Sequence, residues 1–167
     1  MAPPPSTAVP PLAALVVRIL TFICLIISVI ILATNTIKAS DGVNEAKLKF
    51  NHFYAYRYML STAVLGIAYT LIQSAFAIFH VSMGNRIGGD GLVQIEFYGD
   101  KIVSYILATG AAAGFGLSVD LNSLPVNGSD IEDFLNKANA AASLLFIGFL
   151  FSAISSVFSS LSLPKRS

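Results

Sequence analysis

Long apolar stretches separated by shorter polar ones dominate the pattern of this chain. Four of them are long enough to cross a bilayer, since a spanning helix needs about 20 mostly apolar residues. They cover residues 12–33, 58–81, 97–119 and 138–163. Their only Lys, Arg, Asp or Glu residues are Arg18, Asp100 and Lys101. The pattern predicts an all-α membrane protein, a bundle of four transmembrane helices with both termini on the same side.

The first stretch has a second interpretation, a secretory signal peptide. Such a peptide has a basic start, an apolar core of about 7–15 residues and a small-x-small cleavage site. Here the first charge, Arg18, lies inside the apolar stretch, and Ala33-Thr34-Asn35 is a poor cleavage sequence. We therefore expect an uncleaved span. Residues 1–11 are rich in proline and are expected to form a disordered or polyproline tail. Residues 164–167 are expected to form a short C-terminal tail.

The three connections carry different local signals. Residues 34–57 contain a stretch in which every second residue from position 48 to 56 alternates with Lys47, Lys49 and Asn51; the members are Leu48, Phe50, His52, Tyr54 and Tyr56. This pattern indicates either a strand or an extension of the next helix. Residues 82–96 contain several glycines and are expected to form a flexible loop. Ser129 and Glu132 have the spacing of a capping box. The fourth helix is therefore expected to begin outside the membrane, near Asp130.

Composition and charge agree with a membrane protein and exclude other classes. Apolar residues make up 55% of the 167 residues and charged residues 11%, against about 25% charged in soluble domains. The formal net charge of +1 lacks the basic excess of a nucleic-acid-binding protein. Cys24 is the only cysteine, so the chain has no internal disulfide and no Cys-based zinc site. We expect Cys24 to be a core residue.

Catalysis has no support in the sequence. The glycines between residues 84 and 91 lack the Lys-Ser/Thr that completes a P-loop. We find no nucleophile elbow, zinc motif or carboxylate pair in the chain. The prediction is a protein that is not an enzyme, with no catalytic residue, cofactor, metal or small-molecule substrate.

Arg18 and Asp100 are the intramembrane charges that need an explanation. Arg18 lies about 9 Å into the first span, at about 1.5 Å per residue, and charge at such depth is costly. Three interpretations are open. Arg18 extends back to the headgroups, it forms a structural ion pair with Asp100, or both residues serve transport. The first and third spans run in the same direction, so the two side chains enter from the same membrane face. Lys101 points elsewhere on its helix.

Small residues in the third and fourth spans predict close helix packing. Gly110 and Gly114 form a GxxxG motif, and Gly148, Ser152 and Ser156 repeat a four-residue spacing. Small residues let apolar helices approach closely in lipid. The contacts are expected either within one chain or between copies, so these five residues are candidates for helix packing or oligomerisation. Gln73 is expected to bond to a neighbouring helix.

Charge alone leaves the orientation undecided. The side that holds the termini has five Lys and Arg residues, and the other side also has five, so the positive-inside rule gives a tie. Asn127-Gly128-Ser129 is an N-glycosylation sequon on the third connection. Glycosylation of Asn127 requires that connection to be outside, which favours cytoplasmic termini.

Two segments resemble the Casparian strip membrane domain proteins, a group that includes the CASP-like proteins of plants and is related to the MARVEL-domain proteins. The first is DKIVSYIL at residues 100–107, which leads into an Ala/Gly-rich stretch. The second is YRYM at residues 56–59, followed by YTLIQ at residues 69–73. The family is marked by an arginine in its first helix and an aspartate in its third, which correspond to Arg18 and Asp100.

The resemblance implies a four-span plasma-membrane protein with cytoplasmic termini that forms homo- and hetero-oligomers with other CASP-like proteins. On this basis we expect a membrane scaffold, with the bilayer and like proteins as partners. A subunit of a small channel or transporter is the alternative. The first outer connection lacks the signature of the members that build the Casparian strip, and the second lacks cysteine. A role in lignin deposition therefore does not transfer.

Overall fold

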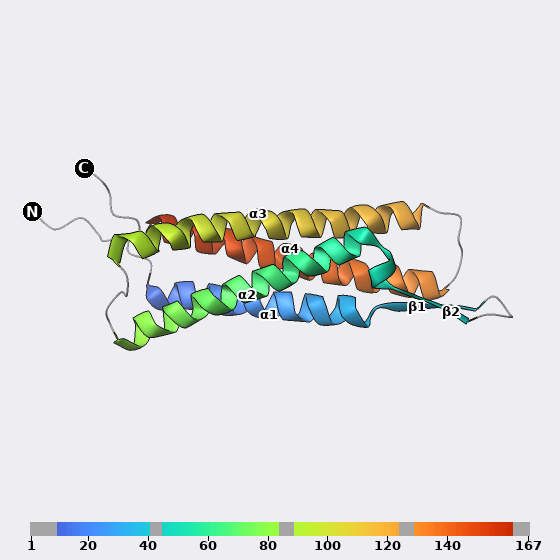
Figure 1. Cartoon of the computed structure of the whole chain (residues 1–167), viewed down its shortest axis with the longest axis horizontal. Helices are drawn as coiled ribbons and strands as arrows, with labels where there is room; N and C mark the ends of the chain where they lie inside the picture. Colours follow the sequence, from blue (N-terminus) through green and yellow to red (C-terminus); the bar gives the residue numbers. More distant parts are fainter. Residues whose placement is uncertain (1–9, 41–44, 84–88, 124–128, 162–167) are drawn as a thin grey trace, which may run out of the picture.

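Four long helices form the structure, which is a computed structural model describing residues 10–40, 45–83, 89–123 and 129–161. The helices are α1 (Pro11–Thr34), α2 (Tyr54–Met83), α3 (Gly89–Asn122) and α4 (Ser129–Leu161). They alternate in direction, so the start of α1 and the end of α4 lie at one end of the bundle (Figure 1). Each is long and apolar enough to cross a membrane. The predicted bundle of four transmembrane helices is confirmed.

The helices stand at the corners of a square. α1 packs on α2 and α4, and α3 packs on the same two helices. α1 and α3 are therefore diagonal to each other. The core between the helices consists of apolar residues contributed by all four of them, among them Leu25, Met59, Leu107, Ala138 and Leu145.

The third helix begins earlier than expected. α3 starts at Gly89 and not near Phe97, so the last part of the expected 82–96 loop is helical. Glycine in the middle of a helix costs about 0.5–1 kcal/mol relative to alanine, but Gly89 and Gly91 lie in the first turn of α3, and Leu-Val-Gln-Ile-Glu follows at residues 92–96. Straight-chain residues in this run have good helix propensity, and the helix extends through them.

Helices α2 and α4 also begin before their apolar stretches. α2 starts at Tyr54, and α4 starts at Ser129, close to the expected start at Asp130. The side chain of Ser129, with its capping hydroxyl, is not among the described groups, and the sequon residue Asn127 lies outside the described residues. The last turns of α2 likewise run beyond residue 81, to Met83.

A β-hairpin follows α1 at the end of the bundle opposite Pro11 and Leu161 (Figure 1). Strands β1 (Thr36–Ser40) and β2 (Glu45–Lys49) are antiparallel, with Lys38 opposite Lys47. A short 3-10 helix, η1 (Phe50–His52), leads into α2. Both interpretations of this connection thus hold in part, since Glu45–Lys49 is a strand and a 3-10 helix precedes α2. The fold therefore contains two strands that the all-α prediction did not include.

Buried polar and aromatic contacts fix the hairpin end of the bundle. The fully buried Asn35 donates from Nδ2 to the Phe134 carbonyl at 2.8 Å. The rings of Phe53 and Phe134 pack on Tyr56 with centroids 5.8 Å away. The Tyr56 hydroxyl bonds to Ser118 at 3.0 Å. These contacts tie α1, α2, α3 and α4 together where the chain leaves the helices.

The predicted small-residue positions all lie inside the bundle. A Cβ on Gly110 would collide with Thr62 Oγ1 of α2 and lie 3.2 Å from Leu145 of α4. A Cβ on Gly114 would lie 2.6 Å from Met59 Sδ, and one on Gly148 would lie 3.1 Å from Leu25 Cδ2. Ser152 and Ser156 of α4 are also buried. The structure places these five residues in contacts within one chain.

We expect Gly110→Ala to destabilise the folded chain, because the added methyl group must displace Thr62. Overpacking of this kind costs about 1–3 kcal/mol. Gly116 on the same helix has nothing within 4 Å of its Cβ position, so Gly116→Ala is the matched control. Thermal unfolding of the purified variants measures both effects. Equal melting temperatures for the two variants would contradict the packing described here.

Candidate functional site: a polar cluster shared by four helices

Arg18 and Asp100 meet inside the bundle at the same depth. Arg18 lies six residues after Leu12, the start of the first candidate span, and Asp100 six residues after Gln94, the start of the third. At about 1.5 Å per residue, both lie about 9 Å into their spans. Both are buried, with 7% of Arg18 and 2% of Asp100 exposed. Because α1 and α3 are diagonal to each other, the Arg18 and Asp100 side chains meet at the centre of the bundle.

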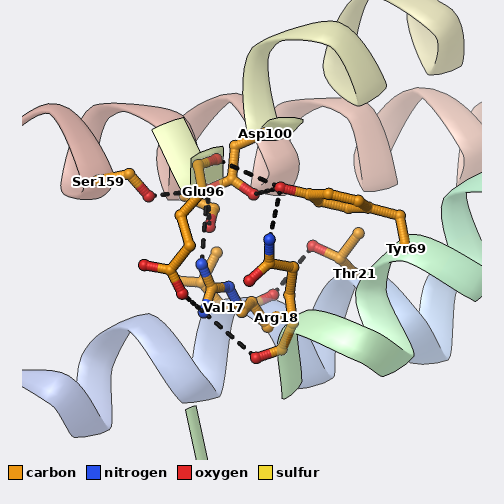
Figure 2. Close-up of polar contacts among 9 residues, drawn as sticks. Val17, Arg18, Thr21, Tyr69, Glu96, Asp100 and Ser159 are labelled. Carbon is orange, nitrogen blue, oxygen red and sulfur yellow. Dashed lines mark hydrogen bonds and ion pairs between the residues drawn. The ribbon is translucent and has the colours of Figure 1, made fainter. Parts of the chain in front are cut away.

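The Arg18 guanidinium lies between two carboxylates. Its Nη2 is 3.6 Å from Asp100 Oδ2, and its Nη1 is 3.6 Å from Glu96 Oε1 (Figure 2). Both distances exceed that of a good hydrogen bond, so the contacts are ion pairs. Glu96 precedes Asp100 by one helical turn and therefore shares its face of α3. The expected pair is in fact a triad.

Three hydroxyl groups hold the Asp100 carboxylate. Tyr69 of α2 donates to Oδ1 at 2.7 Å. Ser155 and Ser159 of α4 donate to Oδ2 at 3.1 and 2.8 Å. A buried carboxylate is costly unless it is paired and hydrogen-bonded, and here both oxygens have partners. The hydroxyl donors come from α2 and α4, so with Arg18 of α1 every helix contributes to the cluster (Figure 2).

Gln73 takes part in a way that the sequence did not indicate. Its side-chain Nε2 donates to the Tyr69 hydroxyl at 3.0 Å, one turn earlier on the same helix. The expected bond from this side chain to another helix is therefore not the one formed. Instead, the backbone carbonyl of Gln73 accepts a hydrogen bond from Arg18 Nη1 at 3.4 Å. That bond links α2 to α1.

Glu96, Tyr69, Ser155 and Ser159 were missed in the sequence. Glu96 was assigned to a loop, and Tyr69 was named only as the first residue of the YTLIQ segment. The serines carried a usable signal, because α4 has no charge after Lys137 and yet places four serines at spacings of three and four residues: Ser152, Ser155, Ser156 and Ser159. All four are buried on one face. A polar face on an apolar helix indicates a polar partner, here Asp100.

The remaining candidates lie apart from the cluster. Lys101 is exposed, and its Nζ lies 4.6 Å from the centre of the Phe97 ring. Cys24 is a free, half-buried thiol. Among the described residues, no group of three or more His, Cys, Asp or Glu side chains could hold a metal ion. The cluster offers paired charge and hydrogen bonds between helices.

Comparisons with known proteins place the chain among plant membrane proteins. The Casparian strip membrane protein domain matches residues 8–151. The CASP-like protein 4D1 of Ricinus communis is 51% identical over 99% of both chains. The CASP-like protein 4D1 of Glycine max is 48% identical, with 91% of this chain and 87% of the relative covered. The CASP-like protein 4D2 of Arabidopsis lyrata subsp. lyrata is 41% identical over 99% of both. No solved structure matches significantly.

Single and double substitutions test the energetic link between Arg18 and Asp100. We expect Arg18→Met and Asp100→Asn each to destabilise the chain, because each leaves buried polar groups without their partner; such losses reach about 3–5 kcal/mol. The double variant should cost less than the sum, by about 0.5–3 kcal/mol for groups in contact. Unfolding of the purified proteins in detergent measures these differences.

The exposed Lys101 supplies the control for the Arg18 and Asp100 substitutions. Lys101→Met should change stability little, since its side chain lies over Phe97 at the surface. Glu96→Gln should cost less than Asp100→Asn, because 19% of the Glu96 side chain is exposed against 3% for Asp100. Strictly additive effects of the Arg18 and Asp100 substitutions would show that the two groups are not coupled.

Proposed function

Because the chain belongs to the Casparian strip membrane protein domain family, we propose that it is a non-enzymatic scaffold of the plasma membrane, which associates with copies of itself and with other CASP-like proteins. The observation that carries the proposal is the mutual pairing of the buried polar side chains. Arg18, Glu96 and Asp100 bind one another or nearby groups. They hold the four helices together, which is what a scaffold unit requires.

The lipid-facing surface supports association within the membrane. Large apolar residues are exposed along every helix, and Ile27, Phe76, Tyr105 and Ile154 are one example from each. The GxxxG motif of α3 packs inside the chain, so contacts between copies would use this outer surface. Association in lipid depends on close van der Waals packing, which such a surface can supply.

A channel or transporter subunit is the alternative function. Ionisable groups inside a membrane bundle often mark a transport path, and Arg18, Glu96 and Asp100 are such groups. The cavity beside them measures only about 10 Å³, about the space of one water molecule. Flux through reconstituted liposomes that Asp100→Asn abolishes, while the variant stays folded, would favour this alternative.

Single-molecule photobleaching in supported bilayers tests the scaffold. We expect the labelled wild-type chain to bleach in more than one step, in a fraction that grows with protein density. Alanine substitutions at Ile27, Phe76, Tyr105 and Ile154, one on each helix, then map the interface. The substitution on the associating face should lower the multi-step fraction, and the other three are matched controls. One-step bleaching of the wild type at every density would contradict the scaffold.

Cysteine labelling tests the orientation, with both termini proposed to be cytoplasmic. In a Cys24→Ala background, we introduce Ser123→Cys at the end of α3, near the hairpin, or Met83→Cys at the end of α2, at the bundle end where α1 starts and α4 ends (Figure 1). Both positions are exposed. A membrane-impermeant maleimide on intact cells should label Ser123→Cys alone. Permeabilised cells, in which both variants should react, are the control. Labelling of Met83→Cys alone would reverse the orientation. The proposed orientation also places Asn127 outside, available for glycosylation.

A further inference from the structure

A small cavity adjoins the polar cluster where the four helices meet. It has a volume of about 10 Å³, and its walls include Arg18 of α1, Gln73 of α2, Asp100 of α3 and Ser155 of α4. About 10–15 Å³ is the space that one buried water requires. The walls are polar, and a cavity must be polar as well as large enough to hold water. Size and lining therefore both fit a single small ligand.

Two residues of the cavity wall each have a buried atom that lacks a hydrogen-bond partner among the described residues. The atoms are Arg18 Nε, a donor, and Gln73 Oε1, an acceptor. Their residues are only 7% and 5% exposed. A buried polar atom left unsatisfied costs about 1–3 kcal/mol, so native structures rarely leave one without a protein group or an ordered water. Both atoms need a partner of opposite hydrogen-bonding character.

We propose that the cavity is a binding site for one water molecule that joins Arg18 Nε to Gln73 Oε1. The ligand must accept from the Nε–H of Arg18 and donate to the side-chain oxygen Oε1 of Gln73, and water does both. A metal cation would face the positive guanidinium. An anion would face the Gln73 oxygen and the Asp100 carboxylate, both of which repel it. Charges of both signs line the cavity, and its two unpartnered atoms are one donor and one acceptor, so a neutral molecule that both donates and accepts fits it best.

The threonines of the cavity wall supply a third partner. Thr21 of α1 and Thr70 of α2 line the cavity, and their hydroxyls donate to the carbonyls of Val17 and Gly66 at 2.9 and 2.7 Å. Each oxygen keeps lone pairs that can accept the second hydrogen of the water. Buried waters make two to four hydrogen bonds, and this arrangement provides three.

The water would add a link between α1 and α2. Within the described part of the chain, the Gln73 side chain otherwise bonds only to Tyr69 of its own helix. Through the water it also bonds to Arg18, next to the existing bond from Arg18 Nη1 to the Gln73 carbonyl. The site belongs to one folded chain, so it does not depend on association between copies or on the proposed scaffold function.

A crystal structure of the full chain at about 2 Å, grown in a lipid mesophase, tests the site. We expect one density peak within about 3.2 Å of both Arg18 Nε and Gln73 Oε1, a hydrogen-bonding distance. Parallel crystals grown in bromide and in rubidium salts distinguish water from ions. The absence of a peak, or an anomalous signal from either ion at this position, would overturn the assignment.

Removal of the acceptor provides a second measurement. Gln73→Met keeps a side chain of similar length without Oε1, and the peak should fall to noise in crystals of this variant. Gln94→Met, at an exposed glutamine of α3, is the matched control and should keep the peak at full height. A peak that persists unchanged in Gln73→Met would show that Gln73 does not hold the water. If Gln73→Met does not fold, the wild-type density decides alone.

Discussion

The cost of charge inside a bilayer is the constraint on which the rest of this structure depends. An ionised side chain near the membrane centre costs at least a few kcal/mol unless it is paired or reaches water. Arg18 and Asp100 lie about two helical turns inside their spans and are almost fully buried. They are tolerable because each offsets the charge of the other and because hydroxyl groups bind the carboxylate. Removing one partner would leave the other as an uncompensated buried charge, which is far worse than losing both. The fold must therefore bring Arg18 and Asp100 into contact.

That requirement fixes how the helices are arranged. Each residue along a helix turns the side chain by about 100° and raises it by about 1.5 Å, so a slip of one residue would carry Arg18 or Asp100 away from the cluster. Because α1 and α3 stand at opposite corners, the charges meet at the centre, and Tyr69 and Ser159 approach from the two remaining helices. The cluster thereby specifies rotation and depth. Glycines then set the separation, since Gly110 and Gly148 admit the side chains of Thr62 and Leu25 where a Cβ would collide or crowd.

The sequence predicted the spans and the central pair but not the full set of partners. Span length and low charge were sufficient for four helices, because hydrocarbon thickness sets a minimum apolar length. Arg18 and Asp100 were visible because so few other charges lie in the spans. Glu96 was missed since the glycines before it suggested a loop, although helix formers follow them. Ser155 and Ser159 were missed because serine is common in membrane helices, and only the neighbouring helix shows which of its serines face a carboxylate. The strand β1 also needed its partner, since pairing with Glu45–Lys49 defines it.

Polar groups on the outer surface are also hydrogen-bonded within the chain. Ser61 and Ser143 are exposed, and their hydroxyls donate to carbonyls one turn earlier on their own helices. The exposed hydroxyls of Tyr58 and Thr109 bond to each other at 2.9 Å across α2 and α3. These groups are already satisfied within the chain, so they gain little by bonding to a second copy. In the proposed scaffold, recognition between copies would therefore rest mainly on the shape of apolar side chains. Shape-based packing of this kind is compatible with related partners whose outer surfaces are similar, and it requires no soluble domain to bring them together.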